Sequence, residues 1–141
     1  AAYPVCEAFS DANLTEEKLQ AIVDMPIWLT HALSDSTVAI ANGEVDGMNL
    51  RPTILEDGSV DLKDDFSNAL YDRLVEAGST NVHYSLFDTV VDLTGEYVQE
   101  DGTPYEYMGH WSWVYTLNND CVEVSDGVET TIFDWLSQQS K

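Results

Sequence analysis

Blocks of hydrophobic and polar positions along the chain predict strands that alternate with helices. Residues 26–33 form a nearly continuous apolar run, which is typical of a parallel strand covered on both faces. Residues 64–77 repeat their apolar side chains at helical spacing, and Gly78 follows where a helix commonly ends. Residues 81–87 are rich in β-branched and aromatic side chains, which favours another strand.

Four further segments complete this pattern. Residues 1–5 are short and apolar and are interpreted as a buried strand, while residues 15–23 predict a short amphipathic helix. Residues 110–117 are dense in aromatic side chains and are interpreted as helical, and residues 130–136 predict a closing amphipathic helix. The resulting order of strand, helix, strand, helix, strand, helix predicts a parallel sheet with covering helices.

Two polar stretches interrupt the pattern. Residues 42–63 (the first excursion) and residues 92–109 (the second excursion) contain glycine, proline and many acids, and predict long irregular loops. A hairpin is expected around Asp57 and Gly58. Neither group of acids follows the calcium-loop pattern of EF-hands, so solvated charge is favoured over a metal site. The two groups are Asp57, Asp61, Asp64 and Asp65, and Asp92, Glu96, Glu100 and Asp101.

Composition adds limits on function. The 141 residues are 44% hydrophobic, which fits one folded domain with a core. The 26 acidic and five basic residues give a net charge of −21, which repels nucleic acid and anionic lipid and excludes a nucleic-acid-binding role. Solubility is the favoured reason for this charge, with a salty habitat or weak cation binding as alternatives. No stretch approaches the ~20 apolar residues of a membrane span.

The two cysteines, Cys6 and Cys121, do not form a disulfide framework. They pair if the fold brings them together, and otherwise they are two buried thiols, which is the commoner case. The chain has no cysteine or histidine cluster with zinc spacing, and no metal or other cofactor is predicted.

Two residues are candidates for chemistry. Asp35 directly follows the apolar strand at 26–33, where functional groups gather in open parallel sheets and where a carboxylate can orient a histidine. The local pattern alone favours a plain turn-capping role for this residue. His110, on the loop after the strand at 81–87, could reach Asp35 through one ring nitrogen and offer the other to a nucleophile. The alternative is a histidine packed among aromatic neighbours.

The other histidines and the tryptophans carry weaker signals. His31 lies inside a predicted strand and is expected in the core, where a hydrogen bond could support the Asp35 turn. His83 is expected to be structural. Trp28 and Trp135 fit core positions, whereas two others are candidates for a substrate-binding wall, although core packing is favoured for them as well. These two are Trp111 and Trp113.

Residues 26–38 carry a resemblance to a known family. The run Pro-Ile-Trp-Leu-Thr-His-Ala-Leu-Ser-Asp-Ser-Thr-Val resembles the segment around the triad acid of α/β-hydrolases. Esterases of the polyhydroxybutyrate-depolymerase and feruloyl-esterase type, and prolyl-oligopeptidase-like hydrolases, have a Pro-led apolar strand followed by His-Gly-x-x-Asp-x-x-Val. Ala32 stands here where the family has glycine.

Four other segments resemble the same family in the same order. They are the strand after the nucleophile helix (residues 1–6), the helix-to-last-strand connection (residues 74–84), the loop of the triad histidine (residues 109–113) and the closing helix (residues 133–136). The resemblance covers nearly the whole chain apart from residues 42–63 and 92–108.

The resemblance implies an α/β fold class: the C-terminal part of an α/β-hydrolase fold, with about three parallel strands, covering helices and two acidic loop excursions. Residues 1–141 would form a single partial domain, with Asp35 as triad acid and His110 as triad base. The serine of the Gly-x-Ser-x-Gly nucleophile motif, which does not occur in this sequence, is expected upstream together with the oxyanion-hole donors.

The implied activity is acyl transfer on an ester, or less readily a peptide, and the chain alone is expected to be inactive. Expected partners are an ester substrate, with plant-polysaccharide esters among the options, the missing N-terminal part of the domain, and a second copy through an exposed sheet edge. A secreted or cell-surface location is favoured over a cytoplasmic one. The alternatives are a carbohydrate-binding module that uses Trp111 and Trp113, and an acidic calcium-binding module.

Overall fold

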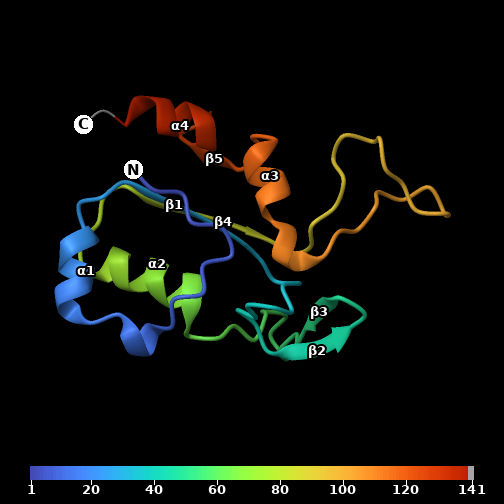
Figure 1. Ribbon diagram of the computed structural model, residues 1–141, viewed down its shortest axis with the longest axis horizontal. Coiled ribbons are helices and arrows are strands. Elements are labelled where there is room, and N and C mark those ends of the chain that lie inside the picture. Colours follow the sequence, from blue (N-terminus) through green and yellow to red (C-terminus); the bar gives the residue numbers. More distant parts are fainter. Residues whose placement is uncertain (140–141) are drawn as a thin grey trace.

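A pair of parallel strands forms the centre of the computed structural model, which describes residues 1–139. β1 (Ile27–Ala32) pairs with β4 (Val82–Phe87), and α2 (Phe66–Glu76) lies in the connection between them (Figure 1). Both strands were predicted. Ala2 and Val5 join β1 only through isolated parallel bridges, so residues 1–5 do not form the regular buried strand that was expected. The fold is mixed α/β with one regular parallel pair.

Helices cover both faces of this pair (Figure 1). α1 (Glu16–Ile22) and α2 lie on one face, and α3 (Trp113–Leu117) and α4 (Ile132–Gln138) lie on the other. Short 3-10 turns occur at η1 (Asp11–Asn13) and η2 (Gly109–Trp111). The predicted helices at 15–23, 64–77 and 130–136 are confirmed to within a few residues. Within residues 1–139, no helix combines the length and the apolar character needed to cross a bilayer.

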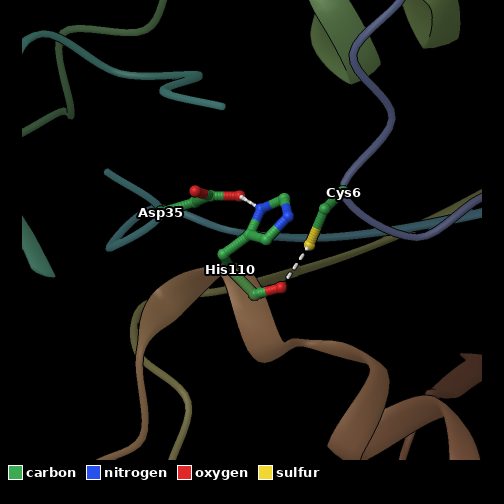
Figure 2. Close-up of side chains that lie close together, drawn as sticks. All are labelled: Cys6, Asp35 and His110. Carbon is green, nitrogen blue, oxygen red and sulfur yellow. Dashed lines mark hydrogen bonds and ion pairs between the residues drawn. The ribbon is translucent and has the colours of Figure 1, made fainter. Parts of the chain in front are cut away.

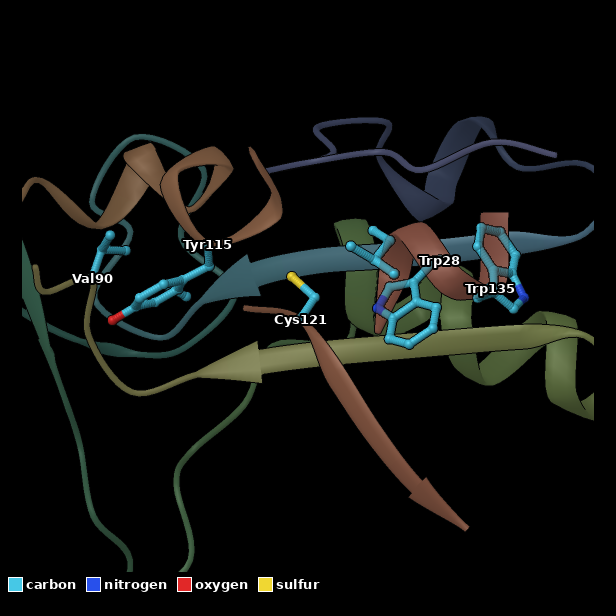
Figure 3. Packing of buried hydrophobic residues seen from close by; sticks show 7 residues of the cluster. Trp28, Val90, Tyr115, Cys121 and Trp135 are labelled. Carbon is cyan, nitrogen blue, oxygen red and sulfur yellow. The ribbon is translucent and has the colours of Figure 1, made fainter. Parts of the chain in front are cut away.

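Side chains of β1 alternate between the two covering layers, which explains why the whole strand is buried. Ile27 and Leu29 pack in a cluster with α1 and α2. Trp28 and Ala32 point to the opposite face and join a cluster with α3 and α4. In Figure 3, Trp28 and Trp135 lie at one end of this second cluster, and their rings meet edge to face at 5.5 Å. The core positions predicted for both tryptophans are confirmed.

Two antiparallel hairpins were not predicted. β2 (Gly43–Asp46) pairs with β3 (Asn49–Pro52) inside the first excursion, which is therefore more regular than expected. β5 (Val122–Ser125) pairs with β6 (Val128–Thr131) before α4. The hairpin expected around Asp57 and Gly58 is reduced to a turn closed by one antiparallel bridge between Ile54 and Val60. Both excursions extend from the carboxyl ends of the central strands (Figure 1).

Candidate active site

Asp35 lies in the turn that follows β1 and is completely buried. Its Oδ1 atom accepts hydrogen bonds from the backbone N–H groups of Thr37, at 2.7 Å, and Val38, at 2.9 Å. Its Oδ2 atom lies 2.9 Å from Nδ1 of His110 and 3.2 Å from Nε2 of His31. One oxygen therefore caps the turn, and the other contacts two imidazole rings.

These contacts keep the Asp35 carboxyl ionised. Burial by itself raises the pKa of a carboxyl group, but hydrogen bonds from His31, Val38, His110 and Thr37 outweigh burial and lower the pKa of Asp35 to about 2. At neutral pH the side chain is a carboxylate, which can only accept hydrogen bonds.

His110 lies in η2, on the loop after β4 where the sequence predicted it. Because Nδ1 faces a carboxylate oxygen, Nδ1 carries a proton, and in the neutral ring Nε2 has a free lone pair. The side chain is 30% exposed, and its ring lies between Asp35 and Cys6 (Figure 2). The arrangement can orient an imidazole and stabilise its charged form, which are the two tasks of an acid beside a general base.

His31 supports the same carboxylate from inside the sheet. Its Nε2 faces Oδ2 of Asp35 and the carbonyl oxygen of Val38, at 3.0 Å, and both atoms only accept, so Nε2 is a donor. Its Nδ1 lies 2.8 Å from Oγ of Ser67 on α2. The predicted hydrogen bond from His31 to the Asp35 turn is thus present. His83 lies elsewhere, stacked on Trp28 with ring centroids 4.9 Å apart.

Gly109 allows the two catalytic candidates to approach each other. A Cβ atom at this position would lie 2.3 Å from the carbonyl carbon and oxygen of Ser34 and 2.5 Å from the backbone nitrogen of Asp35. Any side chain would therefore push residues 106–110 (the base loop) away from residues 34–38 (the acid turn). Gly109 begins the segment 109–113 that resembles the family's histidine loop, and the close approach gives a physical reason for a glycine there.

Cys6 is a third side chain at the site, and the sequence reasoning gave it no role there. Its thiol donates a hydrogen bond to the carbonyl oxygen of His110, at 3.0 Å, and lies 3.1 Å from Oγ of Ser112. Burial raises the pKa of Cys6 to about 11, so the thiol stays protonated. Cys121 is buried in the core, and both cysteines are free, so the open question of their pairing is answered.

One group of metal-ligating side chains has its ligand atoms close enough to share a metal ion: Cys6, Asp35 and His110. Within residues 1–139 it is the one group of three or more Cys, His, Asp or Glu side chains that are this close. Each already has a hydrogen-bonding partner within the protein. The acids of the excursions form no such group in the same part of the chain. Asp57 and Asp101 instead each accept hydrogen bonds from the backbone and hydroxyl of the residue two positions later.

Trp111 and Trp113 lie beside His110 and are 43% and 38% exposed, so the core packing favoured for them was wrong. Their rings lie 5.7 Å apart, and Trp113 meets the His110 ring edge-on at 6.1 Å. Trp111 also borders an open hollow of about 420 Å³ (the aromatic hollow). Its other walls are Tyr97, Tyr105 and Tyr107.

Comparisons with known proteins support the fold. No protein-family model matches the chain, and no curated protein matches it in sequence. A solved structure described as a thermostable esterase superposes on the chain with a TM-score of 0.52 and 22% sequence identity. The match covers 100% of this chain and 24% of the esterase chain. The fold is therefore similar to part of an esterase structure, and this chain spans about a quarter of that protein's length.

Proposed function

We propose that this chain is the acid–base portion of a serine hydrolase with the α/β-hydrolase fold, acting on esters and less readily on peptides. The observation that carries the proposal is the 2.9 Å contact between the buried carboxylate of Asp35 and Nδ1 of the partly exposed His110. Both residues follow parallel strands at their carboxyl ends, where active sites of open α/β sheets lie. The similarity to part of an esterase supports the same reading.

The proposed reaction is acyl transfer. Nε2 of His110 takes the proton of a serine hydroxyl as the serine attacks the ester carbonyl, and the imidazolium later gives this proton to the leaving alcohol. Water then hydrolyses the acyl-enzyme with the same assistance. Asp35 holds Nδ1–H in place and stabilises the imidazolium. The serine and the oxyanion-hole donors come from a segment outside this sequence, since no Gly-x-Ser-x-Gly occurs in it.

Trp111 and Trp113 form the proposed substrate wall next to His110. Exposed aromatic faces offer flat apolar area at little entropic cost, and they suit an aromatic acyl group or the apolar face of a sugar. The net charge of −21 disfavours anionic substrates. A neutral ester, such as one attached to plant polysaccharide, fits both features.

A fluorophosphonate probe, which labels activated serines, tests the triad. The longest product of the gene is treated with the probe as wild type, as His110→Ala and as His83→Ala. Labelling that disappears in His110→Ala but persists in His83→Ala supports the proposal, because His110 contacts Asp35 and His83 does not. Absence of a reactive serine, or equal labelling of wild type and His110→Ala, would overturn it.

A second candidate function is a non-catalytic carbohydrate-binding module. The exposure of Trp111 and Trp113, side by side, is the specific observation that favours it. In this case binding to a neutral polysaccharide would survive His110→Ala and disappear in Trp111→Ala. Affinity electrophoresis in gels that contain the polysaccharide distinguishes the two outcomes.

A further inference from the structure

The two excursions, which lie outside the family resemblance except for Gly109, meet at the side chain of Asn49. This residue begins β3 and is only 8% exposed. Its backbone forms an antiparallel bridge with Asp35, and the N–H of Leu50 donates to the carbonyl oxygen of Ser34 at 2.8 Å. The hairpin of the first excursion is thereby attached to the acid turn through main-chain atoms.

The amide of Asn49 reaches from the acid turn to the base loop. Its Oδ1 accepts the N–H of Gly109 at 2.6 Å, and its Nδ2 donates to the carbonyl oxygen of Tyr107 at 3.1 Å and to Oε1 of Glu106 at 2.9 Å. An N–H can only donate, and a carbonyl or carboxylate can only accept, so these partners fix the orientation of the amide. Only a side chain with both an acceptor and two donors satisfies all three.

We propose that Asn49 is a positioning residue that holds His110 against Asp35. Its backbone is tied to Asp35, and its side chain is tied to the residue directly before His110. The contact from Cys6 cannot replace it, because Cys6 binds the carbonyl oxygen of His110 and not its ring or the preceding N–H. The inference is that Asn49 fixes the position of the His110 ring. Only the importance of this position for catalysis rests on the proposed function.

Asn49→Asp tests the inference with little change in shape. The new oxygen would face the carbonyl of Tyr107 and the carboxylate of Glu106, both acceptors, so the base loop would lose its anchor. Asn42→Asp is the matched control, since Asn42 is an exposed asparagine of the same excursion and the same charge is added. Thermal unfolding of each variant establishes that it is folded.

The readout is nitrogen–proton NMR of the histidine rings in the ¹⁵N-labelled protein. In Asn49→Asp we expect the Nδ1–H of His110 to exchange with water about tenfold faster or more, because its hydrogen bond to Asp35 opens. The His31 ring, held by β1 and Ser67, should keep its wild-type exchange, as should both rings in Asn42→Asp. A general loss of structure would instead affect both rings.

An unchanged His110 ring in folded Asn49→Asp would overturn the inference. Adding Glu106→Gln to Asn49→Asp supplies an amide donor opposite the new carboxylate, and the exchange rate should move back toward wild type; no recovery would count against the proposed contact. If Asn49→Asp does not fold, Asn49→Ser, which cannot satisfy three partners, decides by the same measurement. A perturbed ring in a protein without a reactive serine would refute the proposed function and leave this inference standing.

Discussion

The two imidazoles that share Oδ2 of Asp35 lie in regions of opposite character. His31 belongs to β1, is completely buried, and has partners for both ring nitrogens. His110 belongs to a loop, is 30% exposed, and uses Nδ1 for Asp35 while Nε2 has no hydrogen-bonding partner within residues 1–139. The strand side therefore fixes the Asp35 carboxylate, and the loop side leaves Nε2 of His110 without a partner within residues 1–139.

The two regions also hold their histidines in different ways. β1 places His31 through a regular ladder of backbone hydrogen bonds with β4. The base loop places His110 through a few individual contacts, from Asn49 to Gly109 and from Cys6 to the carbonyl oxygen of His110. Substitutions at the shared carboxylate should therefore affect both regions, and substitutions on the loop should affect only one.

Asp35→Ala is expected to have the largest effect, because it removes the partner of both imidazoles and of two backbone N–H groups. Breaking a buried pair on one side typically costs about 3–5 kcal/mol. Denaturant unfolding measures this loss. Asp24→Ala, at an exposed turn position whose side chain makes no hydrogen bond within residues 1–139, is the control and should change stability by less than about 0.5 kcal/mol. Similar losses in both variants would contradict the central place given to Asp35.

Gly109→Ala is expected to separate the two regions. The new Cβ would overlap the backbone of Ser34 and Asp35, and such overpacking costs about 3 kcal/mol. The Nδ1–H of His110 should exchange with water faster than in the wild type, while the exchange rate of the His31 ring should stay unchanged. Gly102→Ala, with open space around its Cβ but a φ of +83°, measures the backbone strain of a loop alanine without overlap; it should cost less, about 1–2 kcal/mol, and leave the His110 ring unchanged. A folded Gly109→Ala with wild-type stability would refute this account of the close approach.

Low pH should reduce the contribution of the Asp35 carboxylate to the free energy of unfolding. The pKa of Asp35 is lowered from 3.8 to about 2, so its contribution is complete above pH about 4 and is lost as the pH falls through about 2. The contribution is about 2 kcal/mol. Other carboxyls titrate in this range, so the measurement is the difference in unfolding free energy between wild type and Asp35→Asn at pH 5 and at pH 2. A difference that does not shrink at pH 2 would contradict the lowered pKa.

His110→Gln is expected to have the smallest effect on stability, below about 1 kcal/mol, because its side chain is partly exposed and one nitrogen is free. His31→Gln should cost about 2 kcal/mol, since it leaves buried polar groups of Ser67 and Val38 without partners. Fluorophosphonate labelling of the longest gene product should show the opposite order, with a larger loss of labelling in His110→Gln than in His31→Gln. Equal stability losses in the two variants would remove the distinction between the regions.

Much of the central fold was predictable because its signals are local. The apolar run of β1 and the helical spacing of α2 each lie within one segment. Asp35 and His110 were candidates by their positions after strands, but only the family resemblance favoured a joint role over turn capping and aromatic packing. The hairpins β2–β3 and β5–β6 were missed although glycine marks both two-residue loops: Gly47 begins the loop at 47–48, and Asp126-Gly127 form the other. Attention to each such glycine would have found them.

Other features had no local signal. Asn49 resembles any asparagine of a polar loop, and its importance comes from partners 57 to 60 positions away in the sequence. The exposure of Trp111 and Trp113 could not be derived from aromatic density, because a helix as short as α3 gives too few positions for a clear periodicity.

The junction between acid turn and base loop consists largely of main-chain atoms: the N–H of Gly109, the carbonyl oxygens of Tyr107 and Ser34, and the N–H of Leu50. Nearly every amino acid supplies such atoms, so the side chains at most surrounding positions are free to vary. In a saturation library selected for folded protein, we expect Asn49 and Gly109 to be intolerant, whereas positions 93–103 should accept most residues and short insertions. This junction would then let both excursions diverge widely in sequence and length without separating Asp35 from His110.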